Sequence, residues 1–428
     1  MPPTRGIQAI AAAMLGGSPL DLGESEAGGG GGSSSGISYL HRNVAGFVNS
    51  ERLTDSTVFL FWAPKTNIVQ SMTSIQARAG AHSYSVLIGS GLLATIGERI
   101  GEKLRPPKQC AIISDTHVAP RFAEEVEKSL SAAGFQPMLV EVSAGEQFKT
   151  LEQAGSICER MLHSGLDRQS FVVGLGGGVI GDLSGFVAAI FERGVPHVQV
   201  PTTLLAMVDS SIGGKTGVNT TAGKNLLGAV HQPTLVIDDI DTLKTLPRRV
   251  LRQGFAEIIK HAVIADAKMF QDLKNETGSA AVSLQTLIQR NVEIKSNIVA
   301  KDEFDRTGGR AVLNFGHTIG HGIERASNYE ILHGEAVSLG MIAACMISIQ
   351  KAGLPQGTLA ALADLLQRFG LPIRLPERFS HQRILDALKF DKKFENGEIR
   401  FVVTPKIGSA QLSRDVTMDD IREALQAL

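Results

Sequence analysis

The stretch FVVGLGGGVIGDLSGFVAAI, residues 171–190, decides the fold of this chain. It begins with an apolar, β-branched run, Phe171 to Leu175, which has the length of a buried strand. Three glycines at positions 176–178 follow, and the segment from Val179 to Ile190 has the composition of a helix. A strand, a glycine turn and a helix together aim backbone N–H groups and the positive end of a helix at a phosphate. The stretch therefore predicts an α/β domain with an anion site at this turn.

The glycine turn also matches the spacing G-x-G-x-x-G through Gly176, Gly178 and Gly181. In dinucleotide-binding folds this fingerprint opens the first strand–helix unit, whereas here it lies well inside the chain. The polar residues that follow it are more informative: Asp182, Arg193, Thr202, Thr203, Asp209, Lys215, Lys224 and Asn225. Each alone is typical of a solvated loop. Together, two lysines, an arginine and many backbone amides predict a pocket for a polyanionic ligand.

The composition of the chain argues against several classes of protein. Of 428 residues, 42 are Lys or Arg and 43 are Asp or Glu, so the net charge gives no reason to expect binding to nucleic acid or to a membrane surface. The three cysteines, Cys110, Cys158 and Cys345, are far apart and indicate neither a disulfide framework nor a cysteine metal site. A reducing cytoplasm fits this pattern. We find no apolar run that approaches the roughly 18–20 residues needed to span a bilayer.

Residues 1–71 differ in kind from the rest of the chain. Gly28 to Gly32 and Ser33 to Ser35 form a linker-like tract that cannot bury a core. The run from Ile7 to Leu15 resembles a weak signal sequence, but the acidic residues at 21, 24 and 26 count against export and against a transit peptide. We expect a dispensable extension, with Met72 as the true start. A native N-terminal sequence that begins upstream of Met72 would refute this.

From Ser83 onward, strand-like and helix-like segments alternate. The expected strands are residues 83–88, 109–114, 136–142, 171–175, 197–200 and 235–238. The expected helices are residues 92–101, 118–133, 150–164 and 179–190. Alternation of this kind predicts a parallel sheet with helices on both faces.

The alternation stops after Leu246 and Pro247. Beyond that point the expected helices are residues 249–264, 280–300, 314–326, 334–352 and 355–369, with a small hairpin from residues 399–404 and 410–412. The sequence thus predicts a Rossmann-like, parallel-sheet nucleotide-binding domain over 72–243, followed by a mainly α-helical metal-binding domain over 244–428. Ligand sites favour the clefts between such domains.

One candidate cofactor residue lies at a strand end. Asp115 closes the expected strand 109–114, where an acid commonly holds ribose hydroxyls. The same position also suits a helix N-cap for the segment from Val118. The residues alone leave both interpretations open.

The helical half carries three clusters of metal-binding side chains. In GFAEIIKHAVI, Glu257 and Lys260 lie one helical turn apart and share a face. In NFGHTIGHGIE, His317 and His321 are at positions i and i+4, and His333 opens the next helix. A single histidine on an apolar helix is more often structural, but this combination favours a metal. Spacing alone predicts His317 and His321 as ligands, although the motif lacks the glutamate of the H-E-x-x-H metalloproteases.

Several motifs, in the same order and spacing, carry a resemblance to one family. GGGVIGDLSGFVAAIFERGV, VPTTLLAMVDSSIGGKTGVN and GKNLLGAVHQP closely resemble the 3-dehydroquinate synthase family, and the likeness runs from about Ser83 to the C-terminus. The resemblance implies NAD+ and Zn²⁺, or Co²⁺, as cofactors. It implies Glu257, His317 and His333 as metal ligands, with His321 facing the substrate. The resemblance also implies a homodimer, in which Arg193 reaches the site of the second subunit.

The resemblance further assigns the remaining candidate site residues. The AGEQFKT segment matches a nucleotide-contacting loop of the family, and so adds Glu146 and Lys149. The full cofactor set is Asp115, Glu146, Lys149, Gly176, Gly177, Gly178, Asp182, Thr202, Thr203, Lys224, Asn225 and Thr245. The catalytic and substrate-binding set is Asp209, Lys215, Lys260, Lys295, Arg310, Asn314, His321 and Lys392. One acidic position of the family falls in a segment that is one residue longer here, so Asp305 or Arg306 could occupy it.

The family's substrate is 3-deoxy-D-arabino-heptulosonate 7-phosphate, which is converted to 3-dehydroquinate and phosphate in the second step of the shikimate pathway. The resemblance implies transient oxidation of a secondary alcohol, elimination of phosphate, return of the hydride, and ring closure by an aldol step. In this scheme Asp209 and Lys260 orient hydroxyls, and the other cations bind phosphate and carboxylate. Alternatives are a different sugar phosphate cyclase, a metal-dependent polyol dehydrogenase and a non-enzymatic binding module.

Overall fold

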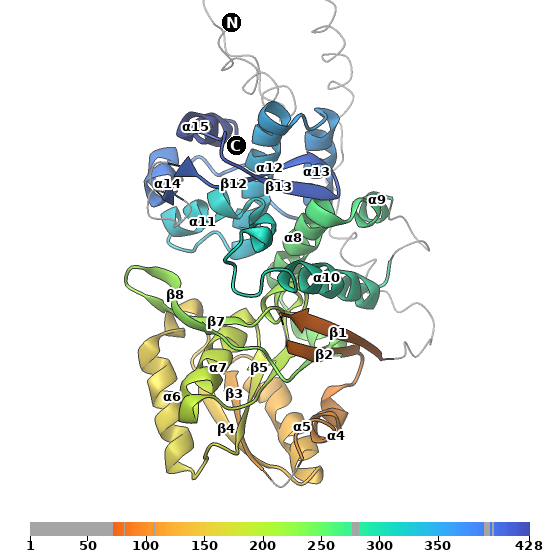
Figure 1. The fold of residues 1–428 in the computed structure, drawn as a ribbon, viewed down its shortest axis with the longest axis vertical. Helices are drawn as coiled ribbons and strands as arrows, with labels where there is room; N and C mark the ends of the chain where they lie inside the picture. Colours follow the sequence, from red (N-terminus) through yellow and green to blue (C-terminus); the bar gives the residue numbers. More distant parts are fainter. Residues whose placement is uncertain (1–71, 81, 106–107, 276–281, 389–393, 396–397) are drawn as a thin grey trace, which may run out of the picture. The chain divides into compact units, whose positions relative to one another are not determined.

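A computed structural model describes residues 72–428 except residues 81, 106–107, 276–281, 389–393 and 396–397 (Figure 1). The predictions for residues 1–71 and for Lys392 therefore fall outside the described residues. The described chain forms two compact units, residues 72–313 and Asn314–Leu428. We treat each unit by itself.

The first unit is built on a seven-stranded sheet with the order β1-β2-β9-β6-β5-β3-β4. Its strands are β1 (Thr73–Ala79), β2 (His82–Gly89), β3 (Gln109–Asp115), β4 (Gln136–Val142), β5 (Phe171–Gly176), β6 (His197–Pro201) and β9 (Leu235–Asp239). All neighbours from β2 to β4 pair in parallel, whereas β1 pairs antiparallel with β2. The six predicted strands and the parallel sheet are confirmed, and β1 is an edge strand that the sequence analysis missed.

Helices cover both faces of this sheet (Figure 1). On one face, α4 (Ile96–Gly101) and α5 (Ala119–Ala132) pack a core that includes Ile112 of β3. On the other, α6 (Leu151–His163) and α7 (Gly178–Ile190) pack against the neighbouring β3 residue, Ile113. Because side chains alternate along a strand, the apolar runs of the parallel strands serve both faces at once. The predicted helices of this half are confirmed.

Three further elements of this unit were not predicted. A π-helical turn, η5 (Ala206–Ser210), follows β6, and the segment after it forms the antiparallel hairpin of β7 (Lys215–Thr220) and β8 (Gly223–Val230). The hairpin depends on close backbone approach, because a Cβ atom at Gly228 would lie 2.2 Å from the Thr216 carbonyl oxygen. Glycine-rich sequence of this kind has little β-propensity, and so the pattern gave no strand signal.

Helices α8 (Arg248–Ala265), α9 (Ala267–Lys274) and α10 (Leu284–Val299) complete the first unit. These helices belong to the first unit because they pack against it: α10 contacts β1, β2 and η5. Strand alternation does stop after β9, as expected, although α9 was not predicted. The compact units divide later, between residues 313 and 314. A functional boundary near residue 243 stays a prediction.

The second unit is mainly helical. It contains α11 (His317–Ala326), α12 (His333–Ala352), α13 (Gly357–Arg368), α14 (His381–Leu388) and α15 (Met418–Gln426). The expected hairpin is present as β12 (Phe401–Lys406) and β13 (Ser409–Ser413), and two short strands, β10 (Phe394–Glu395) and β11 (Glu398–Ile399), pair before it. Helices α14 and α15 were not predicted, and the start of the helix expected at residue 314 lies in a 3₁₀ turn, η8 (Gly309–Asn314).

Helix α12 corrects the expectation that no apolar run approaches the length of a membrane span. By length and composition it could cross a bilayer, with a mean hydropathy of 1.2 over its best window. However, 72% of that window is buried inside the protein, as in the core helix of a globular unit. We therefore interpret α12 as a core helix.

Asp238 is an unusual residue of the central sheet. Its side chain is fully buried in β9, and neither carboxylate oxygen has a hydrogen-bond partner among the described residues. Burial raises the pKa of this carboxyl well above its ordinary value. Asp239, the next residue, differs completely, because its carboxylate accepts hydrogen bonds from the backbone N–H groups of Gly91, Leu93 and Asp241.

We expect Asp238→Val to stabilise the protein by about 1–3 kcal/mol near pH 7.5, because it removes a buried polar group without removing a hydrogen bond. The gain should shrink as the pH falls toward 4.5. The pKa of Asp238 is higher in the folded protein than in the unfolded chain. Between these two pKa values the folded protein keeps a proton that the unfolded chain loses, so wild-type stability falls as the pH rises through this range. Thermal unfolding at several pH values measures this. Asp239→Asn is the control and should destabilise; a lower midpoint for Asp238→Val than for wild type would contradict the prediction.

Candidate functional site

The glycine turn between β5 and α7 has the geometry expected of a phosphate site. Gly177 is the N-cap of α7, so no side chain covers the first N–H groups of the helix. A Cβ atom at Gly176 would lie 2.7 Å from Cβ of Ile180, and one at Gly177 would lie 3.0 Å from Cγ2 of Thr203. The turn therefore requires glycine because of close packing, and it leaves a bare helix N-terminus at the carboxyl edge of the sheet.

Lys149 is the centre of a buried ion-pair network beside this turn. Its Nζ lies 2.9 Å from Oδ2 of Asp182 in α7 and 3.2 Å from Oε1 of Glu146. Lys149 is 3% exposed. Burial disfavours its charge, but the two carboxylates outweigh burial and raise the pKa of Lys149. The structure thus brings three predicted cofactor residues together, with the lysine engaged by acids.

The β7–β8 hairpin adds further predicted residues to this network. Burial opposes ionisation of Glu146, but Lys149 and Lys224 of β8 lower its pKa nonetheless. Asn219, which the sequence analysis did not single out, donates from Nδ2 to Oε1 of Glu146 at 2.8 Å. Its own Oδ1 accepts from the backbone N–H of Asn225, a residue in the left-handed region with φ of 54°. The hairpin is therefore tied to the Glu146 loop.

The predicted cofactor residues at other strand ends make mainly local contacts. Oδ1 of Asp115 accepts from the backbone N–H groups of His117 and Val118, which supports the capping interpretation and leaves the ribose interpretation untested. The Thr203 hydroxyl accepts from the Ala206 N–H, and the Thr245 hydroxyl donates to the Thr242 carbonyl. Thr202 is buried immediately after β6.

A second charged cluster lies where η5, α8 and α10 meet. Lys295 Nζ lies 2.7 Å from both Oδ1 and the carbonyl oxygen of Asp209, and Lys260 Nζ lies 3.9 Å from the same Oδ1. Lys260 also forms an ion pair with Glu257, which is fully buried. Burial alone would raise the pKa of Asp209, but the two ammonium groups hold it well below its usual range. Four predicted residues thus form one buried, charge-balanced group within the first unit.

His261 belongs to this cluster, and sequence reasoning missed it. Nδ1 of His261 lies 2.8 Å from Oδ1 of Asn291, and Nδ2 of Asn291 donates to the Leu287 carbonyl at 2.7 Å. The Leu287 bond fixes Oδ1 as the acceptor, so the His261 proton is on Nδ1 and bare Nε2 lies 3.9 Å from Asp209. Burial lowers the pKa of His261 to about 3. The i, i+4 spacing from Glu257 could have indicated that it shares this face.

The structure separates Asp305 from Arg306. Oδ2 of Asp305 lies 2.6 Å from Nζ of Lys215, and Asp305 is in the left-handed region with φ of 56°. Arg306 instead lies over the ring of Phe304. Of the two candidates, Asp305 is the one that reaches a predicted substrate-binding cation.

Arg310 is held against the loop that precedes Lys215. Its Nη1 donates to the carbonyl oxygens of Gly213 and Glu303. Gly213 has φ of 96°, and a Cβ atom there would lie 2.6 Å from Nη2 of Arg310. Glycine at this position therefore admits the guanidinium group. The anion-binding role of Lys215 and Arg310 stays a prediction, since the printed partners are Asp305 for Lys215 and two carbonyl oxygens for Arg310.

The second unit gathers the three predicted histidines. The ring centroids of His317 and His333 are 5.3 Å apart, and His321 lies 5.4 Å from His317 and 6.2 Å from His333. Nδ1 of His317 lies 3.2 Å from the Phe315 carbonyl oxygen, and Nδ1 of His333 lies 3.1 Å from Oε2 of Glu324. Both partners are acceptors, so each Nδ1 acts as the donor, and in the neutral imidazole Nε2 is then the nitrogen that can coordinate a metal. This donor set fits a divalent metal.

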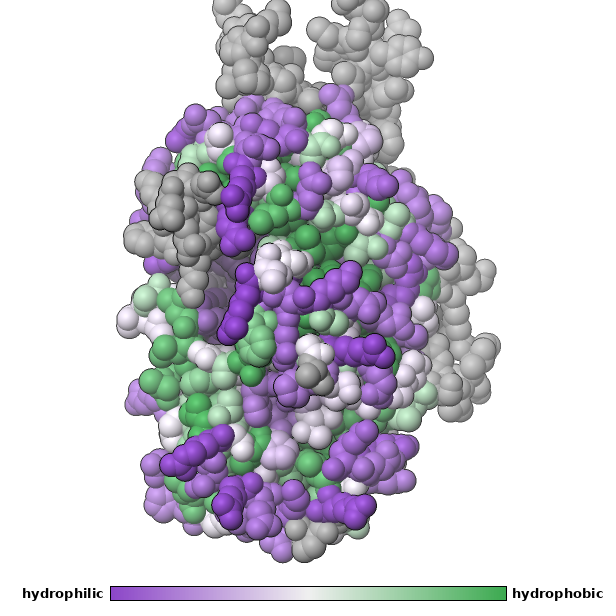
Figure 2. All heavy atoms as spheres, in the orientation of Figure 1, coloured by the Kyte–Doolittle hydropathy of each residue, from purple (hydrophilic) through white to green (hydrophobic). Residues whose placement is uncertain are grey.

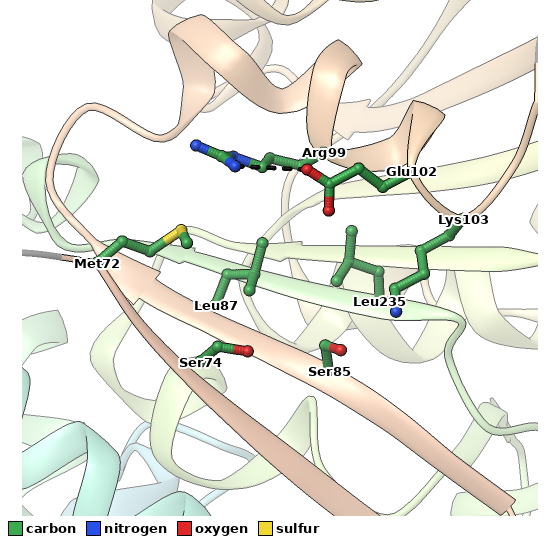
Figure 3. A pocket seen from close by; sticks show the side chains of 8 residues that line it. All are labelled: Met72, Ser74, Ser85, Leu87, Arg99, Glu102, Lys103 and Leu235. Atoms are coloured by element: carbon green, nitrogen blue, oxygen red, sulfur yellow. Dashed lines mark hydrogen bonds and ion pairs between the residues drawn. The ribbon is translucent and has the colours of Figure 1, made fainter.

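Three other features complete the account of the predicted residues. Asn314 ends η8 at the start of the second unit. Arg193 is exposed at the end of α7, where Glu192 and Arg193 adopt positive φ of 48° and 68°. A cavity of about 250 Å³ between α4 and strands β1, β2 and β9 is lined by none of the predicted residues (Figure 3).

Comparisons with known proteins agree with this architecture. The family model "3-dehydroquinate synthase N-terminal" matches residues 139–253, and "3-dehydroquinate synthase C-terminal" matches residues 254–394. The 3-dehydroquinate synthase of Symbiobacterium thermophilum is 43% identical over 354 residues, which is 82% of this chain and 99% of the relative.

Two solved structures with similar folds carry ligands. A 2-deoxy-scyllo-inosose synthase complexed with carbaglucose-6-phosphate, NAD+ and Co²⁺ superposes with a TM-score of 0.75 at 26% identity, over 83% of this chain and 99% of its own. The 2-epi-5-epi-valiolone synthase of Streptomyces hygroscopicus, with NAD+ and Zn²⁺ bound, superposes with a TM-score of 0.72 at 29% identity. The match covers 81% of this chain and 96% of the synthase.

A parallel-sheet α/β domain followed by a helical domain, in this order, is the architecture of the sugar phosphate cyclases. Within that class, the matches to both family models and to close relatives define the branch. The chain belongs to the 3-dehydroquinate synthase family.

The Lys149 network makes a stability prediction. Lys149→Met removes the cation and leaves two partly buried carboxylates close together, which we expect to cost about 3 kcal/mol, the lower end for a broken buried pair. Lys149→Met combined with Asp182→Asn should recover part of that loss, because it removes one uncompensated charge. Thermal and urea unfolding measure both. Lys128→Met, which removes an exposed i, i+4 pair with Glu124, is the matched control and should change little. Equal stability of Lys149→Met and Lys128→Met would contradict the prediction.

Proposed function

We propose that this chain is a 3-dehydroquinate synthase, which converts 3-deoxy-D-arabino-heptulosonate 7-phosphate to 3-dehydroquinate and phosphate. The observation that carries the proposal is the match of both family models, together with 43% identity to a 3-dehydroquinate synthase over nearly its whole length. The reaction is a carbon–oxygen lyase step of the shikimate pathway. Its cofactors in this proposal are NAD+ and a divalent metal, as in the two cyclase structures.

The nucleotide in this proposal binds at the carboxyl edge of the sheet. The N-terminus of α7 at Gly177 binds its phosphates. The Glu146–Lys149–Asp182 network holds the neighbouring loop against α7. Lys224 and Asn225 of the hairpin, Thr202, Thr203 and Thr245 complete the lining, and Asp115 holds ribose hydroxyls. The close approach of Thr203 to Gly177 and the effect of Lys224 on Glu146 support this assignment.

The metal in this proposal is held by Glu257, His317 and His333, with His321 facing the substrate. Nδ1 of His317 and Nδ1 of His333 each lie beside an acceptor oxygen, which supports both as ligands through Nε2. Glu257 contributes a buried carboxylate from α8. When bound, NAD+ supplies a temporary hydride acceptor, and the metal supplies a Lewis acid toward a secondary alcohol.

The chain's own residues bind and orient the substrate around these groups. Asp209 and Lys260 orient its hydroxyls, with Lys295 holding Asp209 in place. Lys215 and Arg310 bind its phosphate and carboxylate, together with Asn314, His321 and Lys392. Since the charges are paired and fixed before the substrate arrives, they act through positioning and electrostatics rather than as strong bases.

The direct test incubates the purified full chain with the heptulosonate phosphate, catalytic NAD+ and Zn²⁺. We expect release of phosphate and formation of 3-dehydroquinate in equal amounts, with no net NADH. Glucose 6-phosphate, whose carbocyclic analogue is bound by the inosose synthase structure, should give no product. Net NADH would favour a polyol dehydrogenase, and turnover of glucose 6-phosphate alone would favour another cyclase.

The ligand assignment predicts different behaviour for two histidines. His333→Ala should lose bound metal and activity together, because it removes a ligand. His321→Ala should lose activity while it keeps the metal, because it removes a substrate contact. Metal content by elemental analysis, measured beside the turnover rate, separates the two. Retention of metal by His333→Ala, or its loss in His321→Ala, would contradict the ligand set.

The dimer in this proposal uses an apolar surface of the first unit. Of the ten exposed large apolar side chains in the described residues, seven come from the Glu146 loop, α6, the end of α7 and β8: Phe148, Leu151, Leu162, Ile190, Leu226, Leu227 and Val230. Figure 2 shows apolar side chains along the side where Figure 1 places β8 and α6. A grouping of this kind marks an interaction surface. Arg193, at the end of α7, reaches the neighbouring site from here.

We expect Leu227→Lys to convert the dimer to a monomer, measured by sedimentation, while Met72→Lys at an exposed site elsewhere does not.

Mixing Arg193→Ala and Lys215→Met chains, each inactive alone, should restore about a quarter of wild-type activity, because half of the chains form heterodimers with one intact site. A wild-type monomer, or no recovery on mixing, would contradict this arrangement.

The proposed compartment is the cytoplasm. The three cysteines are free thiols in the structure, and two of them, Cys110 and Cys345, are buried. Free thiols are typical of a reducing compartment.

A further inference from the structure

Helices α11 and α12 approach each other closely, and this contact determines where the three histidines lie. A Cβ atom at Gly340 of α12 would lie 1.9 Å from the Gly316 carbonyl oxygen, and one at Gly320 of α11 would lie 3.1 Å from the Ala336 carbonyl oxygen. Only glycine allows this separation. As a result, the first turn of α12 lies against α11, and the His333 ring faces His317 and His321.

Glu324 is a buried acid in this contact; it ends the motif NFGHTIGHGIE, but the sequence analysis gave it no role. It is 5% exposed, on the last turn of α11. Its carbonyl oxygen accepts hydrogen bonds from the Tyr329 N–H and the Ser327 hydroxyl, which fix the end of the helix. Asn328 and Tyr329 then adopt positive φ of 50° and 64°, which turns the chain back on itself. This strained turn places His333 beside Glu324.

The contact between the two side chains is specific. Oε2 of Glu324 lies 3.1 Å from Nδ1 of His333. A neighbouring acid, Glu335, does a different task, because it accepts from the Leu332 N–H and caps α12. An ionised Glu324 carboxylate can only accept a hydrogen bond, so Nδ1 of His333 is the donor and Nε2 is the ring nitrogen suited to bind a metal.

We propose that Glu324 is a positioning residue that makes His333 a metal ligand through Nε2. The proposal rests on the metal site of the proposed function. A carboxylate on the far nitrogen of a ligating histidine fixes the tautomer and the ring orientation, and makes the imidazole a stronger ligand. His317 obtains the same tautomer from the Phe315 carbonyl, a neutral acceptor. His333 is therefore the ligand whose strength depends on a charged side chain.

A competing interpretation makes Glu324 a ligand itself. Ligand atoms of His321, Glu324 and His333 all lie within 4.8 Å of one another. The hydrogen bond argues against this arrangement, because the Glu324 oxygen that faces His333 is an acceptor for Nδ1. A metal between those two atoms would have to displace the proton and separate the pair.

The test measures Zn²⁺ affinity of the metal-free full chain by competition with a chromophoric chelator. Glu324→Ala should weaken Zn²⁺ binding about 10–100-fold. Glu324→Gln should recover part of that loss, because the amide oxygen accepts the same hydrogen bond but carries no charge. Glu330→Gln, at an exposed acid of the same connection that pairs with Arg378, is the matched control and should bind Zn²⁺ as wild type does. Unchanged affinity in Glu324→Ala would overturn the proposal.

Two further measurements separate the possible failures. With Co²⁺ at saturation, the visible spectrum of Glu324→Gln should match that of the wild type. If the spectrum instead shows altered coordination, and the Gln and Ala variants lose Zn²⁺ affinity equally, Glu324 is a ligand and the proposal is overturned. Glu324→Ala in a His333→Ala background should cause no further loss, since it acts through His333. If His333→Ala alone leaves Zn²⁺ affinity unchanged, the metal site of the proposed function is wrong, whatever Glu324 does.

Discussion

Lys260 and Lys295 are ammonium groups with almost no access to water, and the first unit is arranged so that both meet carboxylates. An uncompensated buried charge costs several kcal/mol, so this pairing constrains every element that contributes to it. Helix α8 supplies Glu257 and Lys260 from one face, α10 supplies Lys295, and η5 supplies both an acid and a carbonyl oxygen from Asp209. The π-helical turn at η5 is the geometry that lets one residue meet Lys295 twice. Local irregularity of this kind is frequent at functional sites.

The Lys149 network beside the glycine turn follows the same principle at a second place. Lys149 is buried between Glu146 and Asp182, and Asn219 of the hairpin holds Glu146 from the other side. A loop, a helix and a hairpin are thus joined through polar side chains rather than through a shared apolar core. Such networks specify one arrangement when every member is satisfied. In the proposed function, charges that are fixed in advance mean that the site does not have to reorganise when the nucleotide binds, and such preorganisation is the main electrostatic advantage of an enzyme over water.

Sequence reasoning found the parts of the structure that carry a strong period, and it missed those that depend on packing. Strand β5 and helix α7 were predicted because an apolar run, a glycine turn and a helical segment are local signals. The hairpin of β7 and β8 was not, since its glycines serve contacts between strands rather than strand propensity. Asp305 and Arg306 could not be separated by spacing, because a one-residue insertion shifts the register and only the fold shows which side chain faces Lys215. Asn291 lay on a helix without any motif around it, and Glu324 ends the motif NFGHTIGHGIE without a spacing that would assign it a role.

The histidines show why spacing alone was insufficient. His317 and His321 are one helical turn apart, so a helical pattern treats them as equivalent candidates. The group on the other ring nitrogen comes from outside the pattern: a carbonyl two residues earlier for His317, and an acid across a turn with positive φ for His333. His333 itself lies beside α11 only because Gly316, Gly320 and Gly340 leave room for two backbones to touch. Glycines that look featureless in the sequence therefore decide, through helix separation, which imidazole nitrogens are available for coordination.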